Sequence, residues 1–378
     1  MTRTSLSGLL RGALSSRFPR AAMAVAGIAG STLLVLVLLA AHGSLKESVV
    51  VYLGGAGGDV WVAPPGTDNL IRSGGFLPGS LEGTIRSLPH VAAVDPILRT
   101  FVTVEADRDG ARTRLTVLAI GYRTPQGMGG PSAVSSGRRA QGGPEILLDR
   151  AAAFRLGVEL DDRVLVNGRT VRVVGLTRGT NLLATQFLFV DFTTAQRALG
   201  VADRASFFIV RLLPPPDLRG FLLRGREALP DAALFSRAEF VENNLREVTS
   251  GFLPLVALLT AVGLAVGAAL VGLLAQGLAE DRRADVAVLF ALGASPAALS
   301  RGFLAHVELL VLLGGALGTS AAYGLRAILD RLIPTVELNY RAADVMVVFL
   351  LFAFSSALAA LLPVMRLRNT DPLEAFRS

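Results

Sequence analysis

The chain has 378 residues, of which 52% are hydrophobic and only 18% are charged, and its formal net charge is +7. Most soluble domains of this size are more polar, so the composition favours a membrane protein. The basic residues are scattered or adjoin apolar runs, without a stripe of basic and aromatic residues, which argues against nucleic-acid binding. Because the chain has no cysteine, an exported domain would be held together by packing alone.

Four apolar segments are long enough to cross a bilayer core of about 30 Å, which needs roughly 20 helical residues. They predict an α-helical membrane protein with four transmembrane helices at 21–41, 252–279, 302–325 and 343–365. The first segment could instead be a cleaved signal peptide, because small residues follow it. Its apolar run is longer than that role requires, so we expect a retained anchor, although charge counting does not decide between the two.

Positively charged flanks predict the orientation, because arginines beside a span stay on the cytoplasmic side. The tails 1–20 and 366–378 and the loop 280–301 together hold ten arginines, whereas the short external loop 326–342 holds three. The ten are Arg3, Arg11, Arg17, Arg20, Arg282, Arg283, Arg301, Arg366, Arg368 and Arg377. We expect a multi-pass protein of the bacterial cytoplasmic membrane with both termini in the cytoplasm and residues 42–250 outside.

The segment 42–250 is long enough for a core of its own and predicts one α+β domain inserted between the first two transmembrane helices. Apolar and polar residues alternate on both sides of Asp109-Gly110, as in a β-hairpin. A second hairpin is predicted around Asn167-Gly168, where the turn needs positive φ angles.

Strands and short helices follow one another irregularly, which favours a mixed sheet. EILLDRAAAFRLG predicts a strand and a helix that ends at Gly157, FLFVDFTTAQRALG predicts a strand that leads into a helix, and RASFFIVRLL predicts a further strand. A helix is expected near 217–229. Residues 124–144 are rich in Gly, Ser and Pro and predict a mobile surface loop with little to bury.

Residues 237–251 predict a stalk helix that runs on toward the second span. Val241, Leu245 and Val248 form one apolar stripe at helical spacing. An uninterrupted helix here would join the external domain mechanically to the membrane. The alternative is a surface helix that only packs on its own domain.

The sequence offers little for catalysis. Its three histidines, His42, His90 and His306, are outside any HExxH pattern, and there is no cysteine and no GxSxG elbow. The single lysine, Lys46, does not complete a phosphate-binding GxxxxGK[ST] loop. We expect no catalytic, cofactor-binding or metal-binding residue, and if ATP drives this protein, another chain binds it.

The loop 280–301 combines charged residues with an amphipathic helix. Its apolar residues fall at helical spacing, Gly293 can end the helix, and Ser295 with Pro296 can begin the next one. Such a helix could lie at the lipid interface or enter a groove on a cytoplasmic partner. The residues that define it are Arg282, Arg283, Asp285, Val286, Leu289, Phe290, Gly293 and Ser295.

Glu308 is the chief ionisable residue within the predicted spans. Burial of its charge at mid-membrane would cost about 2.5 to 3.5 kcal/mol. It could pair with His306, reach toward the interface, or take part in coupling. With so few ionisable residues, the predicted spans do not suit a hydrophilic path through the membrane.

Two GxxxG pairs predict close helix packing in the spans. They are Gly263 with Gly267 and Gly314 with Gly318. We expect both pairs to pack within one subunit before they serve dimerisation.

Several motifs together resemble the FtsX/MacB-like permeases of ABC transporters. They are DVAVLFALGAS after a charged stretch, a span with Glu308 and GGALG, and GDVWVAPPGTDN and PEILLDRAAAFRLGVELDDRVLVNGRTVRVVGL in the external domain. RFPRAAMAVAGIAGSTLLVL is similar to DevC-type members. The ending LPVMRLRNTDPLEAFRS is similar to the family's DPxEALR-like tail, through Arg366, Arg368, Asp371, Pro372 and Glu374. Phe290 stands where the family often has a basic residue, and Phe376 where it has leucine.

The resemblance implies a permease subunit whose loop 280–301 is a coupling helix, with the residues named above in contact with a separate ABC ATPase that binds ATP and Mg. A second permease copy, identical or related, would complete the assembly. Val241, Leu245, Val248 and Glu308 would transmit ATP-driven motion to the external domain. The substrate would be a hydrophobic or lipid-linked molecule that is exported or extracted, and a periplasmic adaptor would be a further partner, with membrane lipid around the spans.

Two alternatives remain open. One is an FtsX-type regulator that transmits ATPase motion to an extracytoplasmic hydrolase without transport. The other is an anchored binding or sensor module without an ATPase.

Overall fold

The computed structural model describes residues 4–72, 74–108, 111–182, 185–281, 295–332 and 338–368. The chain divides into two compact units. We call Gly43–Leu253 the head domain, and the described residues up to His42 and from Pro254 onward the helical unit. Each unit is considered separately below.

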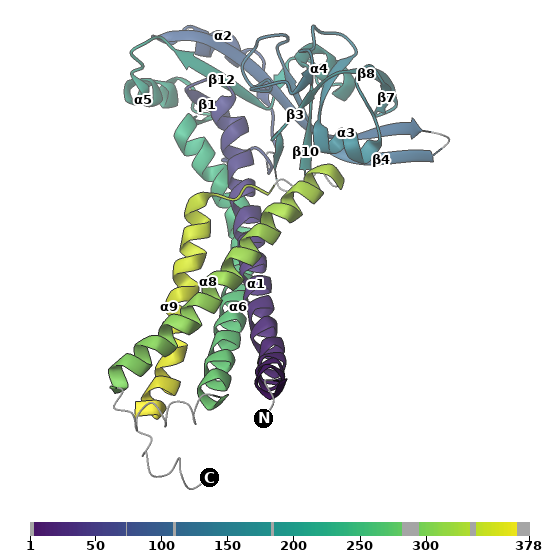
Figure 1. Cartoon of the computed structure of the whole chain (residues 1–378). Coiled ribbons are helices and arrows are strands. Elements are labelled where there is room, and N and C mark those ends of the chain that lie inside the picture. The colour runs from purple at the N-terminus through teal and green to yellow at the C-terminus, as the bar shows by residue number, and fades with distance from the viewer. Residues whose placement is uncertain are drawn as a thin grey trace. The chain divides into compact units, whose positions relative to one another are not determined.

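The helical unit consists of four long helices, and two of them, α1 and α6, also contribute residues to the head domain (Figure 1). They are α1 (Thr4–Gly55), α6 (Arg237–Asp281), α8 (Pro296–Leu332) and α9 (Ala342–Arg368). Three candidate membrane spans are found among the described residues, at Val25–Gly55, Pro254–Leu273 and Val307–Leu332. In α9 the apolar stretch Ala342–Leu358 is shorter than a span, so a four-span count stays a prediction.

Two helices run past the predicted boundaries. α1 continues beyond residue 41 to Gly55, because Val49, Tyr52 and Leu53 are buried in the core of the head domain. α8 continues to Leu332, into the segment 326–342 that was expected to be a loop. There the ion pair between Arg326 and Asp330, 3.8 Å apart and one turn from each other, supports a helix after the apolar run has ended.

The head domain is built on one large mixed sheet with the strand order β13-β1-β12-β3-β4-β10-β6-β8-β5 (Figure 1). The strands are β1 (Val60–Ala63), β3 (Val91–Arg108), β4 (Ala111–Tyr122), β5 (Ser136–Gly137), β6 (Glu145–Asp149), β7 (Arg163–Val166), β8 (Arg169–Thr177), β10 (Thr185–Asp191), β12 (Phe207–Leu212) and β13 (Ala233–Ser236). β2 (Leu77–Pro78) pairs with β11 (Arg204–Ala205), and β9 (Asn181–Leu182) pairs with β10. The β10–β4 and β6–β8 pairs are parallel among antiparallel neighbours, which confirms the α+β fold with a mixed sheet.

Six of these strands close into a small barrel. β3 pairs with β4, β4 with β10, β10 with β6, β6 with β8, β8 with β7, and β7 returns to β3. The closing contact joins Val104 to Val166 and Glu105 to Leu165. Asn167 strengthens it, because its backbone N–H donates to the Thr103 carbonyl and its side chain accepts from the Thr103 N–H, each at 3.0 Å.

Short helices cover the two ends of the barrel. α3 (Arg150–Leu156) follows β6 directly and α4 (Phe192–Leu199) follows β10 directly. Asp149 and Asp191 cap these helices by accepting from the backbone N–H groups of Ala151 at 2.9 Å and Thr194 at 3.2 Å. Since β6 and β10 are antiparallel, α3 and α4 lie at opposite ends of the barrel, as Figure 1 shows.

Local turn chemistry confirms several sequence predictions. Asn167 and Gly168 both have positive φ angles, 46° and 79°, and join β7 to β8 in the predicted hairpin. The strands on either side of the other predicted turn, at 109–110 and outside the described residues, pair as far as Arg108 with Ala111. α3 ends at Gly157, whose φ of 68° is the left-handed conformation that glycine adopts readily.

The prediction of a loop with little to bury at 124–144 was wrong. Met128 and Ala140 are buried, and the Gly129 N–H donates to the Ala56 carbonyl at 2.8 Å. A side chain at Gly129 would collide with Ile97, so glycine here lets the backbone approach the core closely. The segment is therefore packed against the head domain by means of its glycines.

Strands β1, β10 and β12 are buried on both faces, with side chains alternating between two cores. In β10, Phe187 and Phe189 face one core, which also contains the buried ends of α1 and α6, and we call it the stalk-side core. Leu188 and Val190 face the other, which fills the barrel, and we call it the barrel-side core. In the other half of the sheet, helices α2 (Leu81–Arg86) and α5 (Leu218–Ala228) contribute Ile85 and Phe221 to the barrel-side core.

In the helical unit, both GxxxG pairs face other helices of the same chain. A Cβ at Gly314 would lie 2.8 Å from Ile28 of α1, and one at Gly318 would lie 2.7 Å from Thr32. A Cβ at Gly263 would lie 3.2 Å from Val35. The expectation of packing within one subunit is confirmed, because these glycines allow α6 and α8 to approach α1 closely.

Candidate transmission site

The outer end of α1 is anchored in the stalk-side core. The Tyr52 hydroxyl donates to the Gly129 carbonyl at 3.0 Å, within a fully buried setting. The Tyr52 ring meets Phe187 edge-on at 4.9 Å between centroids, and Phe189 at 5.8 Å. Edge-to-face aromatic pairs of this kind add about 0.5 to 1.5 kcal/mol each beyond their burial, so this helix end is firmly held.

The beginning of α6 is anchored in the same core. Phe240 stacks on Trp61 at 4.6 Å with an interplanar angle of 17°, and meets Phe207 at 5.7 Å. Val241 and Leu245 pack beside it as partly buried residues, as the predicted stripe requires. The side chain of Val248 lies outside the described set.

Asn244 is a functional candidate that the sequence analysis missed. Its side chain is buried, accepts from the Leu70 backbone N–H at 2.8 Å and donates to the Phe240 carbonyl at 2.7 Å. Near it, Glu247 forms an ion pair with Arg72 at 2.6 Å. The stalk part of α6 is therefore tied to the segment that follows β1 by polar contacts as well as by packing.

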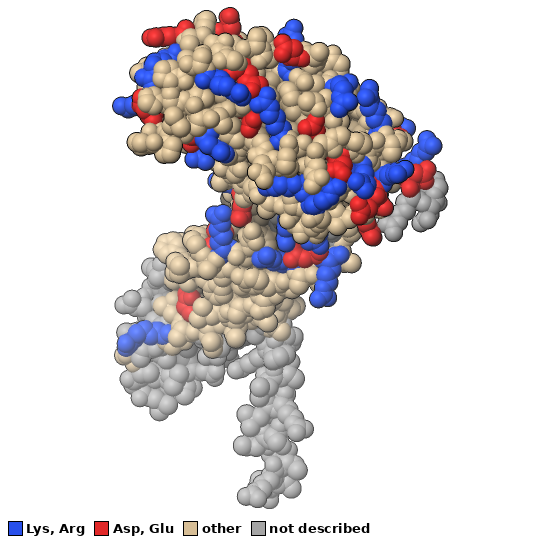
Figure 2. All heavy atoms as spheres, turned by 90° about the horizontal axis from the view of Figure 1, so that it is seen from above, with Lys and Arg blue, Asp and Glu red and all other residues tan. Residues whose placement is uncertain are grey.

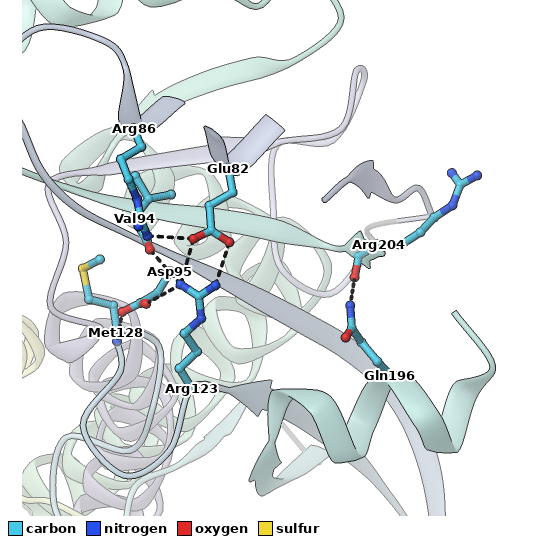
Figure 3. A network of polar contacts seen from close by, with 8 residues as sticks. All are labelled: Glu82, Arg86, Val94, Asp95, Arg123, Met128, Gln196 and Arg204. Carbon is cyan, nitrogen blue, oxygen red and sulfur yellow. Dashed lines mark hydrogen bonds and ion pairs between the residues drawn. The ribbon is translucent and has the colours of Figure 1, made fainter. Parts of the chain in front are cut away.

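An ion network crosses the middle of the head domain (Figure 3). β3 pairs with β12 through its first half and with β4 through its second, so it is the strand shared by both halves of the sheet. Arg123, immediately after β4, binds Glu82 of α2 at 2.7 Å and Asp95 of the first half of β3 at 3.2 Å. Asp95 also accepts from the Met128 N–H at 2.9 Å.

The hydrogen bond to Glu82 raises the pKa of Arg123 above its usual value. Its charge is therefore retained at every accessible pH. The network, which we call the Arg123 junction, links the α2 half of the sheet to the barrel half.

α6 extends without interruption from Arg237 to Asp281, through the stalk and a candidate span. It contains Pro254, at the point in the chain where the head domain ends and the helical unit begins. Proline has no N–H, so the Ser250 carbonyl lacks its usual partner in the helix and the helix can bend there. The predicted stalk is both packed on its own domain and continuous with the membrane helix.

Glu308 is placed in the helical unit beside α9. Its Oε1 atom lies 2.5 Å from the Ser356 hydroxyl, and Ser356 is fully buried. The side chain of His306, the other suggested partner, is not among those described. Glu308 therefore has a polar partner on a neighbouring helix, which lowers the cost of placing it in an apolar setting.

Most of the predicted ATPase-contact residues lie outside the described residues. This holds for Arg282, Arg283, Asp285, Val286, Leu289, Phe290 and Gly293, and for Asp371, Pro372 and Glu374 of the tail. Ser295 is described and exposed, and α8 begins at Pro296 as predicted. Arg366 and Arg368 belong to the last turns of α9.

Within the described part of the chain, no group of three or more His, Asp or Glu side chains could hold a metal ion. Figure 2 shows acidic and basic side chains mixed over the visible face of the head domain. Buried helix ends, the shared strand β3 and the Arg123 junction connect the parts of the head domain.

These features define a membrane-anchored α+β domain whose two anchoring helices are built into its core. The chain matches the family described as MacB-like periplasmic core domain over residues 21–219, more than half its length, and the FtsX-like permease C-terminal family over 255–372. It belongs to the FtsX/MacB-like family of ABC transporter permeases.

Two curated relatives are macrolide export ATP-binding/permease proteins MacB. The one from Rhodopseudomonas palustris (strain BisB18) is 24% identical over 225 residues, which are 56% of this chain and 34% of that protein. The one from Agrobacterium fabrum (strain C58 / ATCC 33970) is 24% identical over 323 residues, 79% of this chain and 48% of that protein. The chain thus spans less than half the length of these relatives.

Solved structures with some similarity include two external domains. The periplasmic region of MacB from Actinobacillus actinomycetemcomitans is 12% identical, with a TM-score of 0.38 over 50% of this chain and 94% of that one. The extracellular domain of the noncanonic ABC-type transporter YknZ from Gram-positive bacteria is 12% identical, with a TM-score of 0.35 over 47% and 98%.

Proposed function

We propose that this chain is a permease subunit that converts ATP hydrolysis on a separate ATPase into displacement of its head domain. One observation carries the proposal. α1 and α6 each continue from a candidate span into the stalk-side core, where Tyr52 and Phe240 fix them. Movement of either helix would have to displace the head domain or break this core.

The ATPase would bind the cytoplasmic loop 280–301, with ATP and Mg on the ATPase chain. The family assignment supports an ATPase partner, and the 378 residues contain no GxxxxGK[ST] loop. A second permease copy would complete the assembly, and an adaptor or a hydrolase outside the membrane would receive the motion.

The substrate we propose is a hydrophobic or lipid-linked molecule taken from the outer face of the membrane. Support comes from the described part of the helical unit, where Glu308 is bound to Ser356 and the outward side chains of α6, such as Leu258 and Val262, are apolar. Such helices offer lipid-facing surface and no row of charges for a hydrophilic substrate.

The orientation can be tested with single cysteines, since the chain has none of its own. Ser136 in β5 and Ser295 before α8 are both exposed. We expect a membrane-impermeant thiol reagent to label Ser136→Cys and not Ser295→Cys in whole cells. Labelling of Ser295→Cys would place the loop outside and exclude contact with a cytoplasmic ATPase.

Transmission itself can be measured between two spin labels, at Asp231→Cys in the head domain and Leu332→Cys at the end of α8, which are both exposed. The full chain in lipid nanodiscs, with the ABC ATPase that co-purifies with it, is compared without nucleotide and with ATP and vanadate. We expect the distance distribution to shift with nucleotide. An unchanged distribution with active ATPase would refute the proposal.

A stalk variant adds a control. Ser250 is exposed on α6, so Ser250→Pro removes one backbone hydrogen bond from the stalk while Ser250→Ala leaves the helix intact. We expect Ser250→Pro to keep ATPase activity and to lose the nucleotide-dependent shift, and Ser250→Ala to keep both.

A further inference from the structure

The end of the barrel beneath α4 is hollow. A cavity of about 290 Å³ is lined by residues of all six barrel strands, of α4 and of the segment that enters β6. This lies just below the usual range for ligand pockets, about 300 to 1,000 Å³, and mouths of β-barrels are among the places where such pockets occur. A six-stranded barrel is too narrow to be hollow along its length, so the space is confined to this end.

The inner wall of the cavity is aliphatic. It is formed by side chains that belong to the barrel-side core and point inward from successive strands and from α4. They include Val102, Ala119, Ile146, Val171, Leu188 and Ala195. Such a wall makes no hydrogen bonds, so it favours the apolar part of a ligand.

The rim of the cavity is basic. Arg169 begins β8, Arg197 lies on α4, and both are exposed at the cavity. No aspartate or glutamate lines it, and neither arginine has a carboxylate partner among the residues that the structure describes. Arg197 is directed along its own helix, with Nε 3.3 Å from the Thr193 carbonyl.

Other arginines beside the barrel do have a carboxylate partner. Arg138 and Arg172 both bind Glu145, at 2.5 and 2.9 Å. Two unneutralised guanidinium groups beside an aliphatic hollow match a molecule with an apolar body and one anionic group, because arginine binds carboxylates by paired hydrogen bonds.

We propose that the α4 end of the barrel binds a small amphipathic carboxylate, with its alkyl chain in the hollow and its carboxylate at Arg169 and Arg197. Thr194 fixes one wall, since its hydroxyl donates to the Gly143 carbonyl at 3.2 Å and holds α4 to the loop before β6. Asn167 fixes the opposite edge through its two bonds to Thr103. The site is preformed and does not depend on nucleotide or on the transmission proposed above.

The probe is a decanoic acid analogue with a diazirine on its chain, photolysed with the full chain in lipid nanodiscs. We expect crosslinks in peptides from β10, α4 and the part of β3 around Thr100 and Val102. Decanoate should displace the probe, and so prevent these crosslinks, at a concentration at least about tenfold lower than two control compounds need. The controls are decyltrimethylammonium, which lacks the anionic group, and acetate, which lacks the alkyl chain.

Three variants complete the test. Arg169→Glu with Arg197→Glu should weaken displacement by decanoate about tenfold or more, whereas Arg226→Glu, an exposed arginine of α5 away from the cavity, should change nothing. Ala198→Trp, at the exposed mouth, should block the crosslinks without entering the core.

Three results would overturn the proposal: crosslinks only in the spans, equal displacement by the cationic amphiphile, or full displacement by acetate. The first or second result would indicate that the alkyl chain of the probe only partitions into apolar surroundings. The third would indicate a general anion site. Retention of the crosslinks in Ala198→Trp would also contradict it, because the mouth would then lie elsewhere. Trp61 fluorescence during urea unfolding checks that each variant is folded.

Discussion

The two faces of the same barrel strands are packed in opposite ways. The stalk-side core is aromatic, with Phe187 and Phe189 around Tyr52, and it leaves the helix ends no freedom. The barrel-side core is aliphatic around the cavity, with Leu188 and Val190 alternating with those phenylalanines along the strand, and it leaves a hollow at one end. Alternation along a strand therefore separates a face that holds the ends of α1 and α6 from a face that borders a hollow.

The comparison predicts unequal costs of truncation on the two faces. Large aromatic side chains in a full core leave large voids when they are removed, whereas small aliphatic ones beside an existing hollow leave little new space. Trp61 is the only tryptophan and is fully buried in the stalk-side core, so its fluorescence reports unfolding of the head domain in the full chain.

The largest effect is expected from Phe240→Ala. It removes a ring that contacts Trp61 and Phe207, and should lower the free energy of unfolding by about 3 to 5 kcal/mol. Urea unfolding in detergent, followed by circular dichroism as well as fluorescence, measures it. Phe154→Ala removes a phenylalanine that is half exposed on α3, and should cost much less. Equal costs would mean that Phe240 is packed no more tightly than a half-exposed phenylalanine.

Asn244→Ala should cost about 1 to 3 kcal/mol, because the buried Leu70 N–H loses its acceptor. The same unfolding experiment measures this loss. Asn243→Ala, the neighbouring and less buried asparagine, is the matched control and should stay within about 0.5 kcal/mol of the parent. A neutral Asn244→Ala would show that the loop after β1 is not held by α6.

Ala119→Val should have the opposite sign. The added methyl groups enter the hollow of the barrel-side core, and filling such a space commonly stabilises a protein by about 0.5 to 2 kcal/mol. The variant should unfold at higher urea concentration and should weaken decanoate binding. A destabilised Ala119→Val protein would indicate that the hollow is smaller than described.

The smallest effect is expected from Glu145→Gln, outside both cores. Hydrogen bonds from Arg138 lower the pKa of Glu145 from 4.5 to about 2. Because the folded pKa is the lower one, the stabilisation is complete above about pH 4.5 and is lost as the pH falls toward 2.

Since Arg138 and Arg172 are about half exposed to solvent, we expect no more than about 1 kcal/mol at neutral pH. Unfolding curves at several pH values should show a smaller loss between pH 4.5 and 2 in Glu145→Gln than in the parent. Parallel losses would mean that other carboxylates dominate acid unfolding.

Features set by neighbouring residues could be predicted from the sequence. The Asn167-Gly168 turn and the end of α3 at Gly157 follow from the need for positive φ angles, which few residues other than glycine and asparagine tolerate. The stripe of Val241 and Leu245 followed from helical spacing. Phe240 and Asn244 continue that stripe, so a wider reading of the same spacing could have found them.

Features set by distant residues could not be predicted. Asn244 and Leu70 are 174 positions apart, and no local pattern reveals that contact. Closure of the barrel depends on pairing β7 with β3 across intervening strands. The glycines of 124–144 predict a mobile loop, but Gly129 instead allows the backbone to lie close to Ile97. The sequence does not show where Ile97 lies, so it cannot distinguish mobility from close packing.

Pro254 has a mechanical consequence for any movement that α6 carries. A helix with a missing hydrogen bond bends readily at that level but resists shortening, so it conveys thrust along its axis and absorbs tilt. We expect Pro254→Ala to stiffen α6 at this level, which spin labels at Asp231→Cys and Leu332→Cys would show as a narrower range of separations. In the parent chain, we expect the same residue to let α6 bend where the two units of the chain meet along the sequence.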